Sequence, residues 1–305
     1  MAAAIGAEFV PAAQGGAVER VLAGTAHWTD SRPLLLEGGV PLLEGAVANL
    51  VNRAGPVVLL AADETQYDIH HPLPYYTSLE RLVHRLSHRF VDGAVAVSEH
   101  VAADLRRLID GPVRVAHPFI LQERFERLGA ISPALDDRRL LAVGEHRPAM
   151  AYDRLVSAVE RAETDVTLDL VGKGTENAPG GDAVRRHGFV SEEAFVDRFA
   201  AASGFAFVGL AGAFPVTTLE AMRAGVPPIV SDRIGTAPLV ADVEPRLVTE
   251  PDPDCIAATL DWYFDPDTDR FALSEAARER SEAFSEERLL PVFEDAFASV
   301  LEALR

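Results

Sequence analysis

The chain alternates short runs of β-forming residues with amphipathic stretches, and this alternation restricts its fold more than any other feature. In the first part of the chain, apolar runs of strand length cover residues 33–36, 56–60, 93–97 and 113–116. Residues 43–51 and 79–90 carry apolar side chains at three- and four-residue spacing, which predicts helices. Strands that alternate with helices form parallel sheets, so we expect an α/β domain.

The alternation restarts after residues 127–137, a segment without periodicity that we interpret as an interdomain linker. The tail from residue 254 is almost wholly helical, with candidate breaks at Pro266 and Pro291. We therefore predict an α/β protein with two doubly wound parallel sheets followed by C-terminal helices. Further strands are expected at residues 139–143, 166–171, 183–190, 204–210 and 228–231, and helices at 152–162, 192–201 and 217–223.

Composition excludes several classes of protein. Acidic side chains number 47 and basic ones 28, so the net charge is −19 and the basic face that a nucleic acid requires is missing. No apolar run approaches the roughly 18 residues of a membrane span, and no basic segment precedes the apolar N-terminal residues, so we expect a cytoplasmic protein. The acidic excess suits high salt or a GC-rich genome, and a halophilic origin is our hypothesis. The sole cysteine, Cys255, is interpreted as a buried structural thiol.

Residues 212–232, GAFPVTTLEAMRAGVPPIVSD, give the most specific indication of a binding site. They lie between two predicted strands, Thr217 and Thr218 suit a helix N-cap, and Glu220 falls in the first turn. The first amides of such a helix have no intrahelical partner and point out of the carboxyl end of the sheet, where an anion can bind. An ordinary helix start predicts the same local structure, so the rest of the chain must decide.

Several motifs, taken in order, resemble family 4 of the retaining glycosyltransferases, which have the GT-B fold of two facing Rossmann-like domains. The likeness extends from about residue 91 to the C-terminus. It implies a shortened acceptor-side domain over residues 1–130, a nucleotide-sugar-binding domain over 131–285, and a C-terminal helix over 286–305 that packs back on the first domain. The motifs are VDGAVAVSEHVAADL, VRVAHPFI, LLAVGEH, LDLVGKG, HGFVSEEAFVDRFAAA and TTLEAMRAGVPPIVSD.

The resemblance implies transfer of a sugar from a nucleotide-diphosphate sugar to an unidentified acceptor, with retention. It places the base near residues 172–174, the diphosphate against residues 214–219, and the ribose against the Glu220 carboxylate. No cofactor or metal is expected, because amides and a helix dipole can hold a diphosphate. The predicted donor-side residues are Gly144, Arg147, Gly172, Lys173, Gly174, Phe214, Thr217, Thr218, Leu219 and Glu220, with Gly15 and Gly16 as a phosphate-facing loop or, equally, an N-terminal coil.

The chain departs from the family pattern at its charged positions. Gly212 stands where the family has a first glutamate, Glu145 follows Gly144 where it has an arginine, and Met150 and Ala151 replace a Lys-Gly pair. Arg147 or His146 could supply a cation from the same loop. These losses favour an alternative, a non-catalytic relative that binds a nucleotide or sugar without transferring it. A sugar-nucleotide epimerase or a phosphorylase ranks lower, and the epimerase would need acid–base carboxylates in the first domain.

The first domain offers two candidate catalytic residues. Asp63 directly follows a predicted strand, and His117 precedes a proline at a strand end, so both could face the acceptor. Asp63 also belongs to a group with Asp68, His70 and His71, but their spacing matches no metal geometry, and we interpret them as a loop lining the cleft.

A basic stripe lies within the predicted helix over residues 79–90. It consists of Arg81, His84, Arg85, His88 and Arg89, opposite Leu79, Leu82, Val83, Leu86 and Phe90. We favour a solvated face with ion pairs, since surface charge runs usually mean no more than that. The alternative is peripheral contact with the inner face of a membrane through Arg81, Arg85 and Arg89, which would suit a glycan or lipid-linked acceptor.

Overall fold

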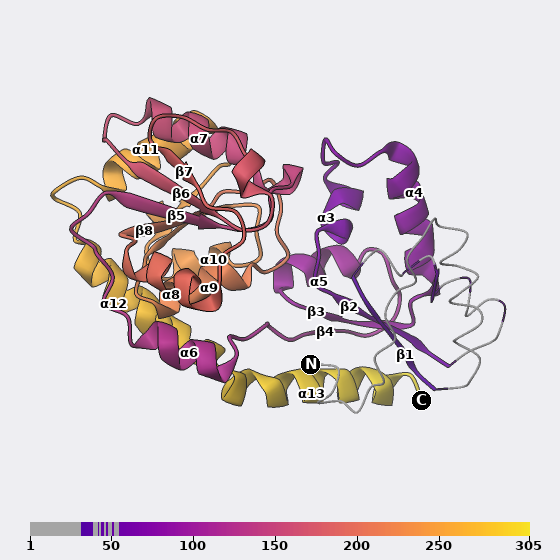
Figure 1. The fold of residues 1–305 in the computed structure, drawn as a ribbon. Coiled ribbons are helices and arrows are strands. Elements are labelled where there is room, and N and C mark those ends of the chain that lie inside the picture. Colours follow the sequence, from indigo (N-terminus) through magenta and orange to yellow (C-terminus); the bar gives the residue numbers. More distant parts are fainter. Residues whose placement is uncertain (1–31, 39–41, 43, 46, 48–50, 52–54) are drawn as a thin grey trace. The chain divides into compact units, whose positions relative to one another are not determined.

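The structure is a computed structural model that describes residues 32–38, 42, 44, 45, 47, 51 and 55–305 (Figure 1). The candidate loop residues Gly15 and Gly16, and most of the helix expected over 43–51, lie outside the described residues. The chain divides into two compact units. The first runs to Pro118 and includes Glu287–Arg305, and the second comprises Phe119–Glu286.

The first unit contains a parallel sheet with strand order β1-β2-β3-β4. These strands are β1 (Leu34–Glu37), β2 (Val57–Ala61), β3 (Gly93–Ala96) and β4 (Val113–Val115). Every residue of β2 and β3 is buried, as expected for central parallel strands covered on both faces. The helices between the strands are α3 (Thr65–His70), α4 (Ser78–Ser87) and α5 (Glu99–Leu105), with the 3₁₀ turn η1 (His88–Phe90) after α4.

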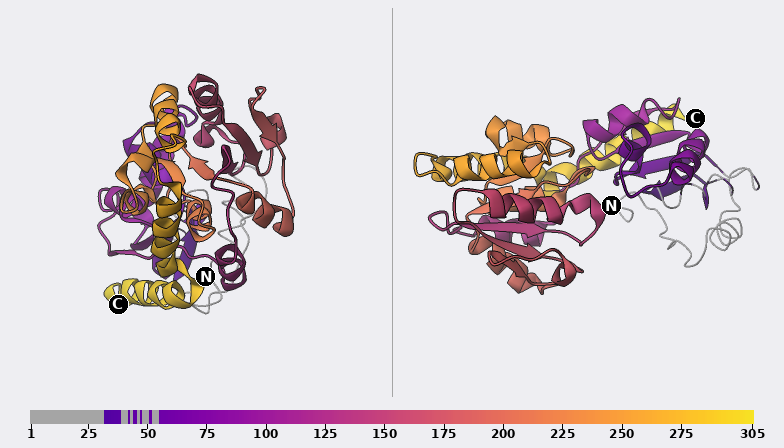
Figure 2. Two further views of the ribbon diagram at one scale, coloured as in Figure 1. Left: turned by 90° about the vertical axis from the view of Figure 1, so that its left-hand side faces the viewer. Right: turned by 90° about the horizontal axis from the view of Figure 1, so that it is seen from above.

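The C-terminal helix α13 (Glu286–Ala303) packs on the sheet of the first unit (Figures 1 and 2). Arg114 of β4 donates through Nε to Ser299 Oγ at 3.0 Å, and a Cβ on Gly93 would lie 2.6 Å from Val300 Cγ1. The helix runs through Pro291, so the predicted break there is wrong. Burial of Phe293, Phe297 and Val300 outweighs the one hydrogen bond that a proline removes.

The second unit is built around a six-stranded parallel sheet with order β10-β9-β8-β5-β6-β7. The chain builds β5, β6 and β7 outward on one side and then returns to place β8 against the other side of β5. Helices α7 and α11 lie on one face of this sheet, and α8, α9 and α12 on the other (Figure 1). The strands are β5 (Arg139–Val143), β6 (Thr167–Val171), β7 (Val184–Arg186), β8 (Gly204–Phe207), β9 (Pro228–Ser231) and β10 (Val248–Thr249), and the helices are α7 (Tyr152–Arg161), α8 (Glu192–Ala200), α9 (Val216–Arg223), α10 (Ala237–Ala241), α11 (Pro253–Tyr263) and α12 (Arg270–Ser281).

The two sheets confirm the predicted parallel α/β class, while several local predictions need correction. Helix α6 (Gln122–Gly129) extends into the predicted linker because Phe125 and Leu128 are buried. Strand β7 is shorter than predicted, and the two-residue β10 was missed because it is too short to show a pattern. Cys255 is exposed rather than buried, since it lies in the first turn of α11. None of the described helices combines the length and apolar character needed to span a bilayer.

The orientation of α4 is the reverse of the one predicted. Ser87 and His88 are buried, whereas Leu79, Leu82 and Leu86 are exposed. Polar contacts explain this, because the His88 ring lies 3.2 Å from Gln66 Nε2 in α3 and its Nδ1 donates to the His84 carbonyl at 2.6 Å. The basic stripe is therefore not a uniformly solvated face.

Buried histidines should make the first unit sensitive to acid. Burial lowers the pKa of His84, His88 and His100 from 6.5, so the folded state favours their neutral forms. The unfolded chain then binds more protons below about pH 6.5, and stability falls as the pH decreases through that region. We expect His88→Gln to reduce the loss of stability between pH 6.5 and 5.5 by about 1 kcal/mol, measured by denaturant unfolding. A loss that His88→Gln leaves unchanged would contradict this linkage.

Ala151 adopts a left-handed conformation at φ 50° and ψ 41°, which glycine adopts without strain. It follows the 3₁₀ turn η2 (Pro148–Met150) and caps α7. We expect Ala151→Gly to leave stability nearly unchanged or to raise it, because relief of backbone strain offsets the lost methyl group. The matched change Ala158→Gly within α7 should cost about 1–2 kcal/mol, since it loses a buried methyl group and helix propensity together. If Ala151→Gly and Ala158→Gly lowered the free energy of unfolding in urea by equal amounts, the backbone at Ala151 would not be strained.

Candidate functional site

Two glycine turns meet at the carboxyl ends of β5 and β6. The Gly144 amide donates to the Val171 carbonyl at 2.9 Å, and the His146 amide donates to the Lys173 carbonyl at 2.9 Å. Gly172 has a φ of 132°, and a Cβ there would lie 2.2 Å from the Gly144 carbonyl oxygen. Only glycine permits this approach, so the structure brings together the predicted residues Gly144, Gly172, Lys173 and Gly174.

The charged residues of these turns are paired with each other. Lys173 Nζ lies 2.8 Å from Glu145 Oε1, and both side chains are exposed. The hydrogen bond lowers the pKa of Glu145 and raises that of Lys173. Glu145 therefore binds Lys173, the lysine that is predicted to contact a phosphate or base. In the related family an arginine occupies the position of Glu145. Arg147, in the same loop, is also exposed.

An apolar side chain fills the space beside Gly144. A Cβ on Gly144 would lie 2.5 Å from Met150 Cε, and Met150 itself is buried. The Tyr152 hydroxyl donates to the Gly144 carbonyl at 3.1 Å, and burial raises the pKa of this phenol. Met150 stands where the family has a lysine, so the inner wall of this turn is apolar.

The loop between β8 and α9 lies beside the turn after β5. The Leu210 amide donates to the Ala149 carbonyl at 2.8 Å and so joins the loop after β8 to the loop after β5. The order of the strands reverses between β5 and β8, which makes this the switch point of the sheet. In doubly wound sheets, ligands bind outside the carboxyl ends of the strands at this point. The loop is closely packed, because a Cβ on Gly212 would lie 3.1 Å from both Ile234 Cγ2 and Pro215 Cγ. The structure thus leaves little room for the family's first glutamate.

Helix α9 begins at Val216 with Pro215 as its N-cap and without a side-chain cap bond, so the predicted threonine cap is wrong. Proline fixes a suitable φ there. Both threonines instead lie inside the first turn, where Thr217 is half-buried and Thr218 is fully buried. The Thr218 hydroxyl is buried and has no hydrogen-bond partner among the described residues. Leu219 is fully buried and Phe214 packs on Phe284, with ring centroids 6.0 Å apart, so these two side chains belong to the core.

Glu220, one turn into α9, is buried and bonded to an arginine from α6. Arg124 Nη1 donates to Glu220 Oε1 at 2.7 Å, while Nη2 and Nε reach the two oxygens of Glu192 in α8 at 2.5 and 2.8 Å. Burial raises the pKa of Glu220, and Arg124 opposes that rise. We take Glu220 to be ionised at neutral pH, because a bonded guanidinium 2.7 Å away compensates the buried charge.

Sequence reasoning missed Arg124, because it lies at the edge of the segment interpreted as a linker. An arginine carries no periodic signal there, and its partners are 68 and 96 positions away along the chain. The amino-acid sequence carried no signal for this pairing, because the acids in α8 and α9 meet the cation in α6 only in the folded chain.

The two candidate catalytic residues lie at carboxyl ends of strands in the first unit. Asp63 follows β2, and its Oδ1 accepts from the Thr65 amide at 3.1 Å. His117 follows β4 and donates through Nδ1 to the Val97 carbonyl at 2.9 Å. No group of residues suited to hold a metal occurs in the described part of the chain, which includes Asp68, His70 and His71.

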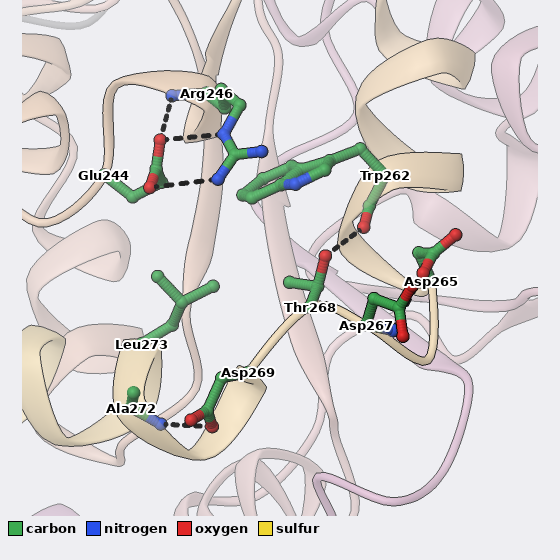
Figure 3. Close-up of a pocket in the computed structure, with 9 residues that line it drawn as sticks. All are labelled: Glu244, Arg246, Trp262, Asp265, Asp267, Thr268, Asp269, Ala272 and Leu273. Atoms are coloured by element: carbon green, nitrogen blue, oxygen red, sulfur yellow. Dashed lines mark hydrogen bonds and ion pairs between the residues drawn. The ribbon is translucent and has the colours of Figure 1, made fainter.

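Figure 3 shows a pocket of about 590 Å³ in the second unit. Arg246 lies over the Trp262 ring, 4.2 Å from its centroid, and bonds to Glu244. None of the predicted donor-site residues lines this pocket, so it is separate from the glycine turns. Its lining consists of Glu244, Arg246, Trp262, Asp265, Asp267, Thr268, Asp269, Ala272 and Leu273.

The Arg124–Glu220 pair yields a prediction about stability. Arg124→Met leaves a buried carboxylate without its cation and should cost about 2–3 kcal/mol. Glu220→Gln keeps a hydrogen-bond acceptor and should cost less, and Arg124→Met with Glu220→Gln should recover more than about 1 kcal/mol of the sum. Denaturant unfolding of the four proteins measures this coupling. Additive losses would show that the two side chains do not interact.

No curated protein matches the chain in sequence, whereas one family model and many solved structures do match it. Sucrose-phosphate synthase from Thermosynechococcus elongatus superposes with a TM-score of 0.72 at 18% identity, over 94% of this chain and 77% of that one. Anabaena HepE in complex with UDP-glucose gives 0.70 at 17% identity, over 92% and 81%.

Trehalose-6-phosphate synthase from Burkholderia multivorans gives a TM-score of 0.65 at 12% identity, over 93% and 74% of the two chains. At these identities the likeness shows the fold alone, which is the GT-B fold with its two parallel sheets and flanking helices. The model of the family Glycosyl transferases group 1 matches residues 126–280, just over half of the chain. The chain therefore belongs to the glycosyl transferases of group 1.

Proposed function

We propose that this glycosyltransferase uses a nucleotide-diphosphate sugar and transfers the sugar with retained anomeric configuration. The C1–O bond to the diphosphate breaks, a C1–O bond to an acceptor hydroxyl forms, and the acceptor's proton leaves with the nucleoside diphosphate. The second unit, Phe119–Glu286, is the proposed donor domain, and the first unit is the proposed acceptor side, so the boundary lies before residue 119 rather than at residue 130. We further propose that the acceptor is a glycan or a lipid-linked molecule and that Asp63 and His117 lie near its reacting hydroxyl.

The observation that carries the proposal is the buried hydroxyl of Thr218 in the first turn of α9. Buried polar groups are almost always hydrogen-bonded, and this hydroxyl has no partner in the described part of the chain. The hydroxyl of Thr236, in the loop after β9, is likewise buried without a partner among those residues. The two loops adjoin, because the Gly235 amide donates to the Gly212 carbonyl at 2.9 Å. Two unsatisfied donors near the amides of a helix start suit a diphosphate.

Glu220 is the proposed ribose ligand. Arg124 binds its Oε1, and among the described residues no donor is bonded to Oε2, which can therefore accept from a ribose hydroxyl. The ion pair fixes the carboxylate in the ionised form that binds a diol best. HepE was crystallised with UDP-glucose, which makes UDP-glucose the first donor to test. Gly144, Gly172 and Gly174 are proposed to admit the nucleotide close to the backbone, with Arg147 or Lys173 as the cation that faces the phosphates.

Three observations favour a second candidate, a protein that binds the nucleotide without transferring the sugar. Gly212 has little room for a catalytic carboxylate, Met150 fills the position of a lysine, and Glu145 pairs with Lys173. Each lost charge-assisted bond is worth about 1.5–3 kcal/mol of transition-state stabilisation, so their combined loss could abolish transfer. Incubation with donor and a panel of acceptors separates the two candidates, since the binder would saturate with nucleotide and release no nucleoside diphosphate.

Thr218→Val should change stability and affinity in opposite directions. Removal of an unsatisfied buried hydroxyl should leave unfolding free energy unchanged or raise it by about 1 kcal/mol. The same change should weaken UDP-glucose binding about tenfold in calorimetry, and Glu220→Gln should weaken it about 10- to 100-fold. Ser203→Ala is the matched control, because the buried Ser203 hydroxyl bonds to the main chain of Arg139 at the amino ends of β8 and β5, and its loss should only destabilise. Undiminished binding by Thr218→Val and Glu220→Gln would place the nucleotide elsewhere.

A further inference from the structure

Helix α4 presents an apolar face to solvent at the surface of the first unit. Four large side chains on its face and in the following turn are exposed, and they recur at intervals of three and four residues, so they form one stripe. Other exposed large apolar residues of the described chain are Val51 and Val292 in the first unit and Leu121, Phe189 and Phe271 in the second. The stripe, which we call the α4 apolar stripe, consists of Leu79 (70% exposed), Leu82 (52%), Leu86 (49%) and Phe90 (39%).

The polar side of α4 holds the helix in this orientation. Arg81 donates to the Tyr76 carbonyl at 2.8 Å and lies 3.5 Å from Asp68 of α3. The His88 ring contacts Gln66, which also lies in α3. Thr77 and Glu80 form a capping box that fixes the helix start. These contacts hold the polar side of α4 inward, and the α4 apolar stripe remains exposed.

Arginines border the α4 apolar stripe. Arg85 and Arg89 are exposed, and neither forms an ion pair with a carboxylate of the described residues. At 100° per residue they fall on one flank of the stripe, whereas Glu80 falls on the other flank and is bonded to Thr77. Two such cations beside an apolar stripe form a local exception in a chain of net charge −19.

We propose that the α4 apolar stripe, with Arg85 and Arg89, docks on the surface of an anionic lipid bilayer. A helix that lies in the interface buries its apolar face at the boundary of the acyl chains while flanking arginines attract anionic headgroups. The net negative charge of the protein does not prevent this, because charges beyond about 10 Å from the surface are screened at 0.1 M salt. The two arginines favour a lipid surface over an apolar protein partner, and docking is independent of the donor used.

Sedimentation of the full chain with vesicles tests the proposal. The protein should bind vesicles with 30% phosphatidylglycerol in phosphatidylcholine and bind pure phosphatidylcholine about 25-fold less, because neutral lipid removes the attraction of both arginines. Arg85→Gln with Arg89→Gln should weaken binding to anionic vesicles about 25-fold, or about fivefold for each arginine. Leu82→Ser with Leu86→Ser should reduce it at least tenfold, because the two leucines supply the buried apolar area. The exposed Leu121→Ser in the second unit is the matched control and should not change binding.

Thermal unfolding and sedimentation velocity show whether the α4 apolar stripe is covered by the chain itself or by a second copy. If the stripe is free, Leu82→Ser with Leu86→Ser leaves the midpoint of unfolding nearly unchanged, since exposed substitutions have small effects. A large fall in the midpoint would show that the stripe packs within the chain, and a dimer lost in this variant would show that a second copy covers it. Either result, or vesicle binding that survives both double variants, would overturn the proposal.

Discussion

The position of β5 at the centre of the second sheet organises the rest of this molecule. Because β5 pairs with β6 on one side and β8 on the other, the loops that follow these strands meet at one edge of the sheet. The contact between the Gly144 carbonyl and Gly172 is possible only without side chains, and the bond between Leu210 and Ala149 joins the opposite loop. Parallel pairing and glycine therefore place the helix start of α9 beside the glycine turns.

The electrostatics of this edge are unusual for a proposed anion site. Lys173 pairs with Glu145, and Arg124 pairs with Glu192 and Glu220. Under our proposal, a diphosphate would meet Arg147, the helix start of α9 and two buried hydroxyls that no described residue satisfies. Binding through main-chain dipoles requires little charge, and this suits a surface as acidic as this one.

Both units pair buried carboxylates with arginines, as Glu220 is paired with Arg124 and Asp169 with Arg139 in the second unit, and Asp68 with Arg81 in the first. In the first unit, the buried His88 also contacts the buried Gln66, which joins the turn after α4 to α3. These contacts hold the polar side of α4 inward and turn its leucines to solvent. The same side chains that stabilise the first unit thus create its apolar surface.

The α/β class and most strands could be predicted from the amino-acid sequence, because hydrophobic runs and periodicity are local properties of the chain. The sequence also located Glu220 and the glycine turns through a family likeness and glycine's special conformations. The folded structure was needed to show that Arg124 binds Glu220, that Thr218 lies buried in the first turn rather than capping α9, and that Pro291 stays inside a helix. It also showed which side of α4 faces solvent. An amphipathic pattern defines a polar face and an apolar face, but it does not show which of the two packs against the rest of the chain. These outcomes depend on packing between residues far apart in the chain, where burial and pairing outweigh local preference.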